Sequence, residues 1–261
     1  MDEKFLDRMD QELSGWSEPH EHLQASLDND DLTLFCQPIR ALTGAQEFPM
    51  AEVLVRMRKE ESSLLPPGEF LPVFEHYRMM PQLDRWVVRA VARHLGRGSR
   101  VPRFTINLSG QTVEDANFPD YVAEQARAAG ISPDTLLFEI DEAEILARPW
   151  PAELLGAALK RIGCGTLIDS FGRASVSFAP LKTLRVDFIK VDGSITRQIL
   201  ARASAETKLK AILRVGEALG IGVIAECVED QDVLLRLKAL GTGYVQGFGI
   251  SHPHPIDSIA R

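Results

Sequence analysis

A regular alternation of short apolar runs with longer amphipathic segments begins at residue 32 and continues almost to the end of the chain. The apolar runs are LTLFCQPI, AEVLVRM, RFTINLS, LLFEID, TLIDSF, DFIKVD, GVIAECV and YVQGF, which makes eight strand candidates. Between most of them lie segments of helical length; WVVRAVARHL, ETKLKAILRVGEALG and VLLRLKAL each place their apolar residues on one helical face. This alternation predicts a mostly parallel sheet covered by helices. Eight strands in about 220 residues predict closure into a (β/α)8-type barrel.

The connection between the first two strand candidates departs from this pattern. The segment RALTGAQEFPM contains a Thr-Gly turn signal and is shorter than the dozen or more residues of a crossover between parallel strands. We therefore predict that the first strand runs antiparallel to the second, so that the α/β fold is a modified TIM-type (β/α)8 barrel. A second irregular segment, RASVSFAPLKTLRV, follows the fifth strand and is expected to be a loop that leads into a short helix.

The first 17 residues stand apart from the barrel pattern. The apolar residues that fall near helical spacing there are Phe5, Leu6, Met9, Leu13 and Trp16. They predict a short amphipathic helix, which either links the chain to another domain or packs on its own barrel. We expect residues 1–17 to form this N-terminal helix or linker and residues 18–258 to form the barrel domain.

Composition narrows the class of partner and the compartment. The net charge of −8 argues against duplex DNA, which needs a basic face to neutralise its phosphates. No apolar stretch approaches the roughly 20 residues of a membrane span, and the acidic start MDEKFLDRMDQEL is unlike a secretory signal. The three cysteines, Cys36, Cys164 and Cys227, are scattered, as is typical of reduced thiols. These features predict a cytoplasmic location.

Nearly every strand candidate carries one polar residue in an otherwise apolar run. These residues are Gln37, Glu52, Asn107, Glu139, Asp169, Lys190, Glu226 and Gln246. Because the carboxyl ends of parallel barrel strands face one mouth, we expect these side chains to converge there. Buried unpaired carboxylates cost several kcal/mol each, roughly, so such a cluster is expected to hold a cation.

The ligand types indicate the kind of cation. The oxygen-bearing side chains in this set include Glu52, Asn107, Glu139 and Asp169. No His or Cys joins them, which favours Mg²⁺, Mn²⁺ or Ca²⁺ over zinc. Such metals commonly bind a phosphate substrate and activate a water molecule. Lys190 is placed to hold that water or to neutralise phosphate charge, and Arg56 is placed to clamp a phosphate.

These segments together resemble the EAL domain, the bacterial family of cyclic-di-GMP-specific phosphodiesterases. AEVLVR resembles the family's Glu-Ala-Leu-Leu-Arg, INLSGQ its Asn-Leu-Ser, FEIDEAE its Leu-Glu-Ile-Thr-Glu and IDSFG its Asp-Asp-Phe-Gly. FIKVD is similar to Ile-Lys-Ile-Asp, AECVED to Ala-Glu-Gly-Val-Glu and VQGF to Gln-Gly-Tyr, and CQPI and SHPHP also match. The resemblance runs from about residue 18 to about residue 256.

The resemblance implies a fold, a reaction and a set of roles. The fold is a TIM-like barrel with an antiparallel first strand, and the reaction is hydrolysis of one phosphodiester bond of cyclic di-GMP to linear diguanylate with Mg²⁺ or Mn²⁺. The implied metal ligands are Glu52, Asn107, Glu139 and Asp169; Lys190 positions the water and Glu226 lies near the second metal, as catalytic residues; the substrate contacts are Gln37, Arg56 and Gln246.

Two departures from the family pattern fall in the same half of the implied site. Ser170 stands in the place of the second aspartate of Asp-Asp-Phe-Gly, and a serine hydroxyl is a weak neutral ligand. After the phenylalanine the family reads Gly-Thr-Gly-Tyr-Ser-Ser, whereas this chain reads GRASVSF and introduces Arg173. Loss of one of two metals should cost on the order of 10³-fold or more in rate. One metal site is therefore expected, and the second is in doubt.

The resemblance and its two departures leave three possible functions. The first is a degenerate EAL domain that binds cyclic di-GMP as a receptor or regulatory module with weak or no hydrolysis. The second is a metal-dependent phosphodiesterase in which Arg173, or a water held by Ser170, compensates for the missing aspartate. The third is a protein-interaction domain that no longer needs the nucleotide. A homodimer and an upstream signalling domain or protein partner are also open expectations.

Three further residues have two readings each. Glu142 is either hydrogen-bonded to the site or a charge at a helix N-terminus. Asp192 either orients Lys190 or caps the next helix. Cys227, beside Glu226, is either sensitive to oxidation or a buried, inert thiol.

Overall fold

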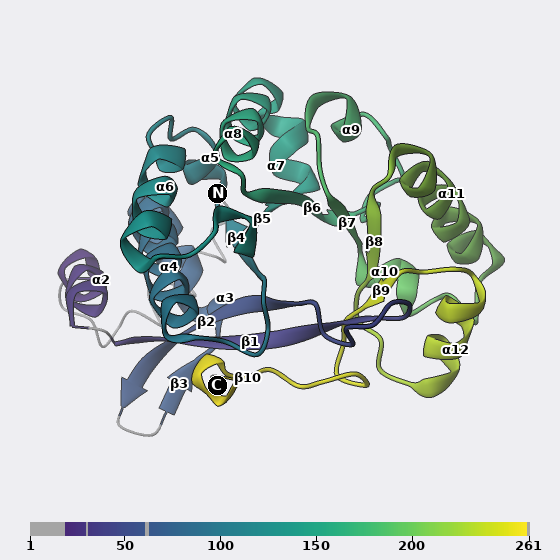
Figure 1. The fold of residues 1–261 in the computed structure, drawn as a ribbon, viewed down its shortest axis with the longest axis horizontal. Helices are drawn as coiled ribbons and strands as arrows, with labels where there is room; N and C mark the ends of the chain where they lie inside the picture. The colour runs from purple at the N-terminus through teal and green to yellow at the C-terminus, as the bar shows by residue number, and fades with distance from the viewer. Residues whose placement is uncertain (1–18, 30, 61–62, 260–261) are drawn as a thin grey trace.

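The computed structural model describes residues 19–29, 31–60 and 63–259, and these form an α/β barrel (Figure 1). The helix expected near the N-terminus lies outside the described residues. Within them, the first element is the helix α2, Pro19–Asp28. No helix among the described residues combines the length and the apolar character that crossing a membrane requires.

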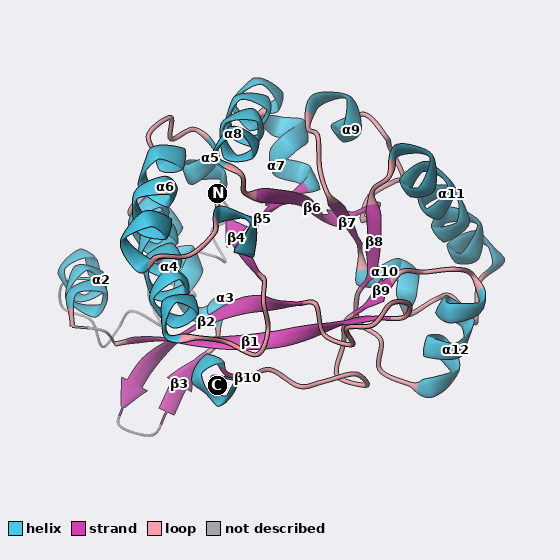
Figure 2. Ribbon diagram, in the orientation of Figure 1, coloured by secondary structure: helices cyan, strands magenta, loops and turns pink. Residues whose placement is uncertain are grey.

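Within the described residues, eight strands close into a ring, and two short strands are added at its edges (Figure 2). The strands of the ring are β1 Leu32–Ala41, β2 Met50–Glu60, β4 Phe104–Leu108, β5 Leu136–Asp141, β6 Gly165–Phe171, β7 Phe188–Val191, β8 Gly222–Ala225 and β9 Tyr244–Val245. The added strands are β3 Ser63–Leu65 on β2 and β10 His254–Pro255 on β1. The eight strand candidates of the sequence correspond to the eight strands of this ring.

The first strand runs against the others, as the short first connection predicts. The strands β1 and β2 pair antiparallel, with Gln37 opposite Glu52, and β1 also pairs antiparallel with β9. Every other neighbouring pair in the ring, from β2–β4 to β8–β9, is parallel. The prediction of a modified TIM-type barrel with an antiparallel first strand is therefore confirmed.

Helices lie around the outside of the ring (Figure 2). Their bounds are α3 Pro67–His76, α4 Met80–Arg97, α5 Gly110–Val113, α6 Phe118–Ala129, η1 Pro133–Thr135, α7 Glu142–Ala147, α8 Pro149–Ile162, α9 Pro180–Thr183, α10 Gly193–Thr196, α11 Ala203–Leu219, α12 Gln231–Ala239 and η2 Ile256–Ile259. The three amphipathic segments of the sequence form α4, α11 and α12. The loop after β6 leads into the short helix α9, as expected.

The amphipathic pattern places most of the apolar residues of these helices on the barrel. In α4 the apolar stripe through Val87 and Val91 is buried, and the helix ends before Gly98, whose φ of 99° suits glycine. In α11 Leu209 and Ile212 are buried, but Leu219 is 58% exposed. The expectation that Leu219 belongs to the packed face was wrong, because it is the last residue of the helix and projects beyond the barrel surface.

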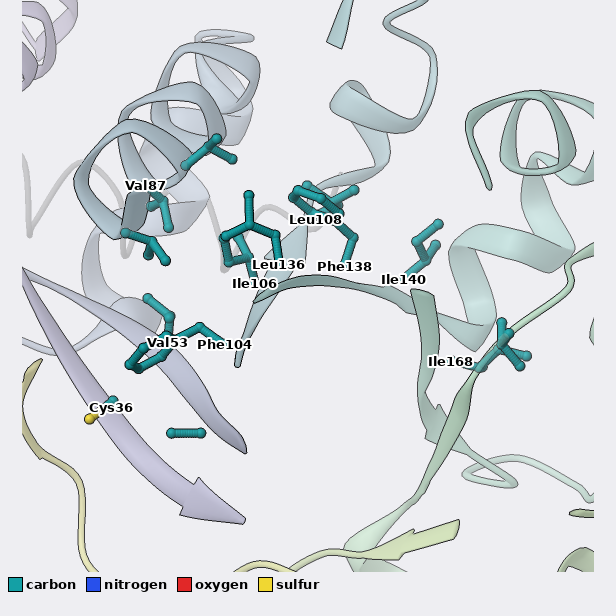
Figure 3. Packing of buried hydrophobic residues seen from close by; sticks show 14 of the residues in the cluster. Cys36, Val53, Val87, Phe104, Ile106, Leu108, Leu136, Phe138, Ile140 and Ile168 are labelled. Atoms are coloured by element: carbon teal, nitrogen blue, oxygen red, sulfur yellow. The ribbon is translucent and has the colours of Figure 1, made fainter. Parts of the chain in front are cut away.

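The outer faces of the strands form most of the core. Figure 3 shows side chains from β1, β2, β4, β5 and β6 that belong to one buried cluster, together with Val87 of α4. The labelled strand residues are Cys36, Val53, Phe104, Ile106, Leu108, Leu136, Phe138, Ile140 and Ile168. This packing ties the strands to the helices and leaves the inner faces of the strands for the site.

The two-residue period of the strands builds two layers inside the barrel. The apolar layer is a second buried cluster made of Ile39, Met50, Leu137, Leu167, Phe188 and Ile224. Each of these residues lies two positions from one polar residue of the mouth, so both point to the same side of the sheet. For example, Leu137 precedes Glu139 and Phe188 precedes Lys190. The apolar layer therefore fills the barrel below the polar layer and excludes water from its underside.

Candidate functional site

Lys190 is the centre of the polar layer at the mouth of the barrel. It lies on β7, is 1% exposed, and its ammonium contacts carboxylates carried by β2, β5, β6 and the residue after β8. The distances from its Nζ atom are 2.9 Å to Glu52 Oε2, 2.8 Å to Glu139 Oε2, 3.6 Å to Asp169 Oδ1 and 3.2 Å to Glu226 Oε1. Glu226 comes directly after β8. The four distances show that these carboxylates converge on Lys190, as the strand pattern predicts.

Burial and the shared ammonium set the pKa values of this cluster. Burial alone would lower the pKa of Lys190, but the carboxylates around it, Glu139 first, hold that pKa well above its ordinary value. Burial raises the pKa of Glu139 to about 8 and that of Glu226 to about 7, in spite of the attraction of Lys190. The pKa of Glu52 is lowered: burial would raise it, but Lys190 and the hydrogen bonds of neighbouring amides outweigh burial.

Glu52 joins this cluster to the amide side chains. Its Oε1 accepts a hydrogen bond of 2.9 Å from Asn107 Nδ2 on β4, and its Oε2 accepts one of 2.8 Å from Gln246 Nε2. Gln246 follows β9 and also donates to Gln37 Oε1 of β1 at 3.2 Å. Gln37 donates to the carbonyl of Ser251 at 2.9 Å, which ties the chain after β9 to the mouth. One hydrogen-bonded row therefore runs across β4, β2, β9 and β1.

The donor set of the mouth fits a hard divalent cation. Four carboxylates face one ammonium, so the cluster has more negative groups than Lys190 can neutralise. Glu139 Oε1 and Asp169 Oδ1 are buried and accept no hydrogen bond, which leaves two oxygens available as ligands. Among the described residues no group of three His, Cys, Asp or Glu side chains is already arranged around a metal-sized centre, because the Lys190 ammonium lies between the carboxylates. A cation would therefore bind beside Lys190, next to Glu139 Oε1 and Asp169 Oδ1.

Arg56 is the one expected site residue that does not join the cluster. It lies four residues beyond Glu52 on β2, where its Nη1 donates to the carbonyl of Val55 at 2.8 Å. Its guanidinium lies 5.6 Å from the centre of the Phe35 ring, and burial lowers its pKa. Arg56 shares the inward face of β2 with Glu52, so it is set further out along the mouth.

Cavities lie on both sides of the Glu52–Asn107 pair. One, of about 330 Å³, is mostly apolar and lies between β2, β4 and helices α3 and α4; Leu54, Met80 and Asn107 are among its lining residues. Another, of about 200 Å³, lies where β1, β8 and β9 end; Glu52, Gln246 and the exposed Phe248 line it. The row of polar groups therefore separates two hollows, each with apolar side chains in its wall.

The end of β6 carries the two departures from the family pattern. Ser170 is 4% exposed and its φ of 57° is in the left-handed region. Its Oγ lies 3.2 Å from Asp169 Oδ2 and 2.5 Å from Arg173 Nη2. Of the two readings for Asp192, the structure shows the cap: it accepts from Ser194 N at the start of α10, and its other oxygen accepts from Arg173 Nε. Both readings hold for Glu142, which begins α7 and accepts from Gly172 N at 2.9 Å.

Cys227 is half-buried next to Glu226. Its Sγ accepts a hydrogen bond of 3.0 Å from Arg197 Nη2, and its φ of 56° is in the left-handed region. Burial and the Glu226 carboxylate raise its pKa, so the thiol form predominates and the inert reading is favoured.

Sequence reasoning missed two carboxylates that support the mouth. Asp84 of α4 is buried; its Oδ2 accepts from Ser109 N, Ser109 Oγ and Thr112 Oγ1 at 2.5–3.0 Å, and fixes the chain that follows Asn107. Burial raises its pKa to about 6. A charge on the apolar face of an amphipathic helix was the available signal. Asp141 contacts Arg173, and nothing in the sequence alone indicates that pair.

The comparisons with known proteins agree with this geometry. The fold is a mixed α/β barrel, and its mouth holds an acidic site centred on a lysine. The EAL domain family model matches residues 20–253, so this chain belongs to the EAL domain family.

Relatives and solved structures extend the family assignment. The chain is 31% identical over 237 residues to the cyclic di-GMP phosphodiesterase PdeF of Escherichia coli, covering 90% of this chain and 31% of that protein. It is 29% identical over 236 residues to the cyclic di-GMP phosphodiesterase PdeB of Shewanella oneidensis, covering 89% of this chain and 28% of that protein. The chain thus spans about a third of the length of these relatives. The crystal structure of the FimX EAL domain of Pseudomonas aeruginosa bound to c-di-GMP superimposes with a TM-score of 0.84 at 28% identity, covering 91% of this chain and 96% of that one.

Proposed function

We propose that this EAL domain binds cyclic di-GMP at the barrel mouth and acts as a receptor or regulatory module whose hydrolysis is weak or lost. Two relatives named as cyclic di-GMP phosphodiesterases and a similar domain bound to the dinucleotide support the choice of ligand. The single observation that carries the loss of hydrolysis is at the end of β6. There a neutral serine, held by Arg173, stands where the family pattern has a second aspartate.

The mouth suits a ligand with two flat bases and two phosphates. The cavities on either side of the Glu52–Asn107 pair could each take one base, with apolar walls for the ring faces. Gln37 and Gln246 offer amide groups to one base edge, and Phe248 is an exposed aromatic ring beside them. Arg56 offers a planar cation to a phosphate. Ligand binding at these groups needs no second metal.

We further propose that one Mg²⁺ or Mn²⁺ binds at the mouth. The ligands would be Glu52, Asn107, Glu139 and Asp169. When bound, such a cation polarises a phosphate oxygen and lowers the pKa of water. Lys190 would present its ammonium to an anionic oxygen near such a cation, and the Glu226 carboxylate would lie beside that ammonium.

A metal-dependent phosphodiesterase that releases linear diguanylate is the second candidate. The names of the relatives favour it, and Lys190 and its four carboxylates are in place. A domain without nucleotide binding is the third candidate. It is disfavoured because a buried, lysine-centred carboxylate cluster is costly to keep without a ligand to offset it.

A hydrolysis assay beside a binding assay tests this proposal. Purified protein is incubated with cyclic di-GMP and Mn²⁺ or Mg²⁺, linear product is followed by anion-exchange chromatography, and binding is followed by calorimetry with Ca²⁺. We expect binding with no product, and product from the variant that carries both Ser170→Asp and Arg173→Ala. Multiple turnovers by the unmodified chain would show instead that it is a phosphodiesterase. If the chain did not bind cyclic di-GMP, the third candidate, a domain without nucleotide binding, would remain.

Further observations support proposals on the location of the domain, its oligomeric state and its upstream connection. The three cysteines all lie within the described residues and form no disulfide, which supports a cytoplasmic location. Trp150 and Leu154 are more than half exposed, one turn apart on α8, and a second copy of the chain could cover them in a homodimer. Residues 1–17 would then connect the barrel, residues 18–258, to an upstream signalling domain or protein partner. Analytical ultracentrifugation of the chain tests the homodimer, and cell fractionation tests the location.

A further inference from the structure

The loop after β6 turns the side chain of Arg173 back toward the mouth. The guanidinium donates to Asp192 Oδ2 through Nε at 3.0 Å and to Ser170 Oγ through Nη2 at 2.5 Å, and its Nη1 lies 3.5 Å from Asp141 Oδ2. These partners come from the ends of β5 and β6 and from the cap of α10. One cation thus joins the ends of two strands and the cap of one helix.

The backbone of this turn is built to make those contacts. The β6–β7 register shifts between Ile168 and Phe171, and Ser170 adopts its left-handed conformation at that point. Gly172 follows with a φ of 83°, and a Cβ there would meet Ile195 Cδ1 at 3.0 Å. The amide of Gly172 is held by Glu142, and Arg173 N donates to Ser170 O at 3.3 Å. The turn therefore has a defined shape that directs Arg173 inward.

Ser170 connects the guanidinium to Asp169. Its hydroxyl can accept from Arg173 and donate to Asp169 Oδ2 at the same time, which a carboxylate at this position could not do. The other oxygen of Asp169 faces Lys190 at 3.6 Å. Asp169 therefore lies between two cations, one beside it and one reached through a hydroxyl.

The carboxylates around Arg173 keep its guanidinium positively charged. Its hydrogen bond to Asp192 outweighs partial burial, and with Asp141 and Asp169 it raises the pKa of Arg173, so the side chain remains a cation. Asp141 and Ser170 both contact this guanidinium. The two departures from the family pattern, Ser170 and the loop that carries Arg173, therefore belong to one network.

We infer that Arg173 takes the place of a second metal cation beside Asp169, so that this chain binds a single divalent cation. The guanidinium supplies the positive charge on that side of the mouth, and the serine removes a ligand that a second metal would need. Arg173 is 61% exposed, so an anionic ligand can also reach it from the mouth. The inference rests on the metal site of the proposed function but does not depend on nucleotide binding.

The number of bound Mn²⁺ ions tests this inference. Free Mn²⁺ is measured by electron paramagnetic resonance during titration of the protein without nucleotide. We expect one ion per unmodified chain and two per chain carrying both Ser170→Asp and Arg173→Ala. Aspartate tolerates the left-handed backbone at residue 170 better than most residues do, so the variant should fold, which circular dichroism checks.

Two further variants keep the result interpretable. Arg173→Lys retains the charge and should still bind one ion, whereas Arg185→Ala removes an exposed arginine elsewhere and should also bind one. Two ions on the unmodified chain, none on it, or one ion on the folded double variant would each overturn the inference. One ion together with no binding of cyclic di-GMP would leave the inference standing and overturn the proposed receptor function.

Discussion

Two cations flank Asp169 in this barrel, and they are built in different ways. Lys190 is 1% exposed, comes from the middle of the ring and contacts four carboxylates on strand ends. Arg173 is 61% exposed, comes from the loop after β6 and contacts its partners partly through the hydroxyl of Ser170. The strand-built side, Lys190 with its four carboxylates, keeps the residues of the family pattern. The loop-built side, Arg173 with Ser170, departs from it. The comparison suggests that the mouth retains recognition on one side and changes its chemistry on the other.

The largest expected effect is at Lys190. Lys190→Met leaves Glu52 and Glu139 buried without their cation, so the free energy of unfolding should fall by about 3–5 kcal/mol. Urea denaturation at pH 7 measures the change. Lys210→Met is the matched control, because Lys210 pairs with Glu206 at the surface and is 50% exposed; it should cost less than about 1 kcal/mol. Equal losses for the two variants would contradict the view that the strand-built side is the stabilising centre.

A second test uses Asp84, a buried carboxylate held by neutral donors instead of a cation. Its pKa is raised from 3.8 to about 6, so the folded state binds this proton more tightly than the unfolded state does. The stabilisation from Asp84 is therefore complete below about pH 4 and is lost as the pH rises through 6, about 3 kcal/mol in all. Asp84→Asn should remove this dependence.

Denaturation curves at several pH values measure it as a difference between the two proteins. The unmodified chain should lose stability relative to Asp84→Asn between pH 4 and pH 7. A difference that does not change with pH would show that Asp84 is paired with a charge after all.

The strand-built side was predictable from the sequence and the loop-built side was not. A polar residue two positions from an apolar one, as Glu139 is from Leu137, follows directly from the pleat of a strand, so the convergence on Lys190 could be expected. The contact between Asp141 and Arg173 depends on the left-handed backbone at Ser170 and on the turn at Gly172. Such a turn has no periodic signature, and Asp84 was missed because its role appears only when α4 meets the chain after β4.

Metal binding offers a third, smaller test of the strand-built side. At free Mn²⁺ about 100 times the dissociation constant, the unmodified chain should gain about 2.7 kcal/mol of stability, and EDTA should reverse the gain. Asn107→Ala removes one proposed oxygen ligand, from an exposed side chain. The affinity for Mn²⁺ should fall on the order of tenfold or more. Asn117→Ala, at the exposed start of α6, is the control and should leave Mn²⁺ affinity unchanged. Equal Mn²⁺ affinity in the two variants would place the cation elsewhere.

The smallest expected effect is on the loop-built side. Arg173→Gln removes a cation that contacts Asp192 and, at 3.5 Å, Asp141, but solvent screens these pairs because the side chain is 61% exposed. The free energy of unfolding should therefore fall by less than about 1 kcal/mol, and 1 M NaCl should reduce even that difference. Urea denaturation at low and high salt measures both. A loss as large as that of Lys190→Met would mean that the loop holds the barrel together, and Arg173 would then be a structural residue instead of the counterpart of a bound cation. The loop should thus affect which ions and ligands bind while barely affecting whether the chain folds.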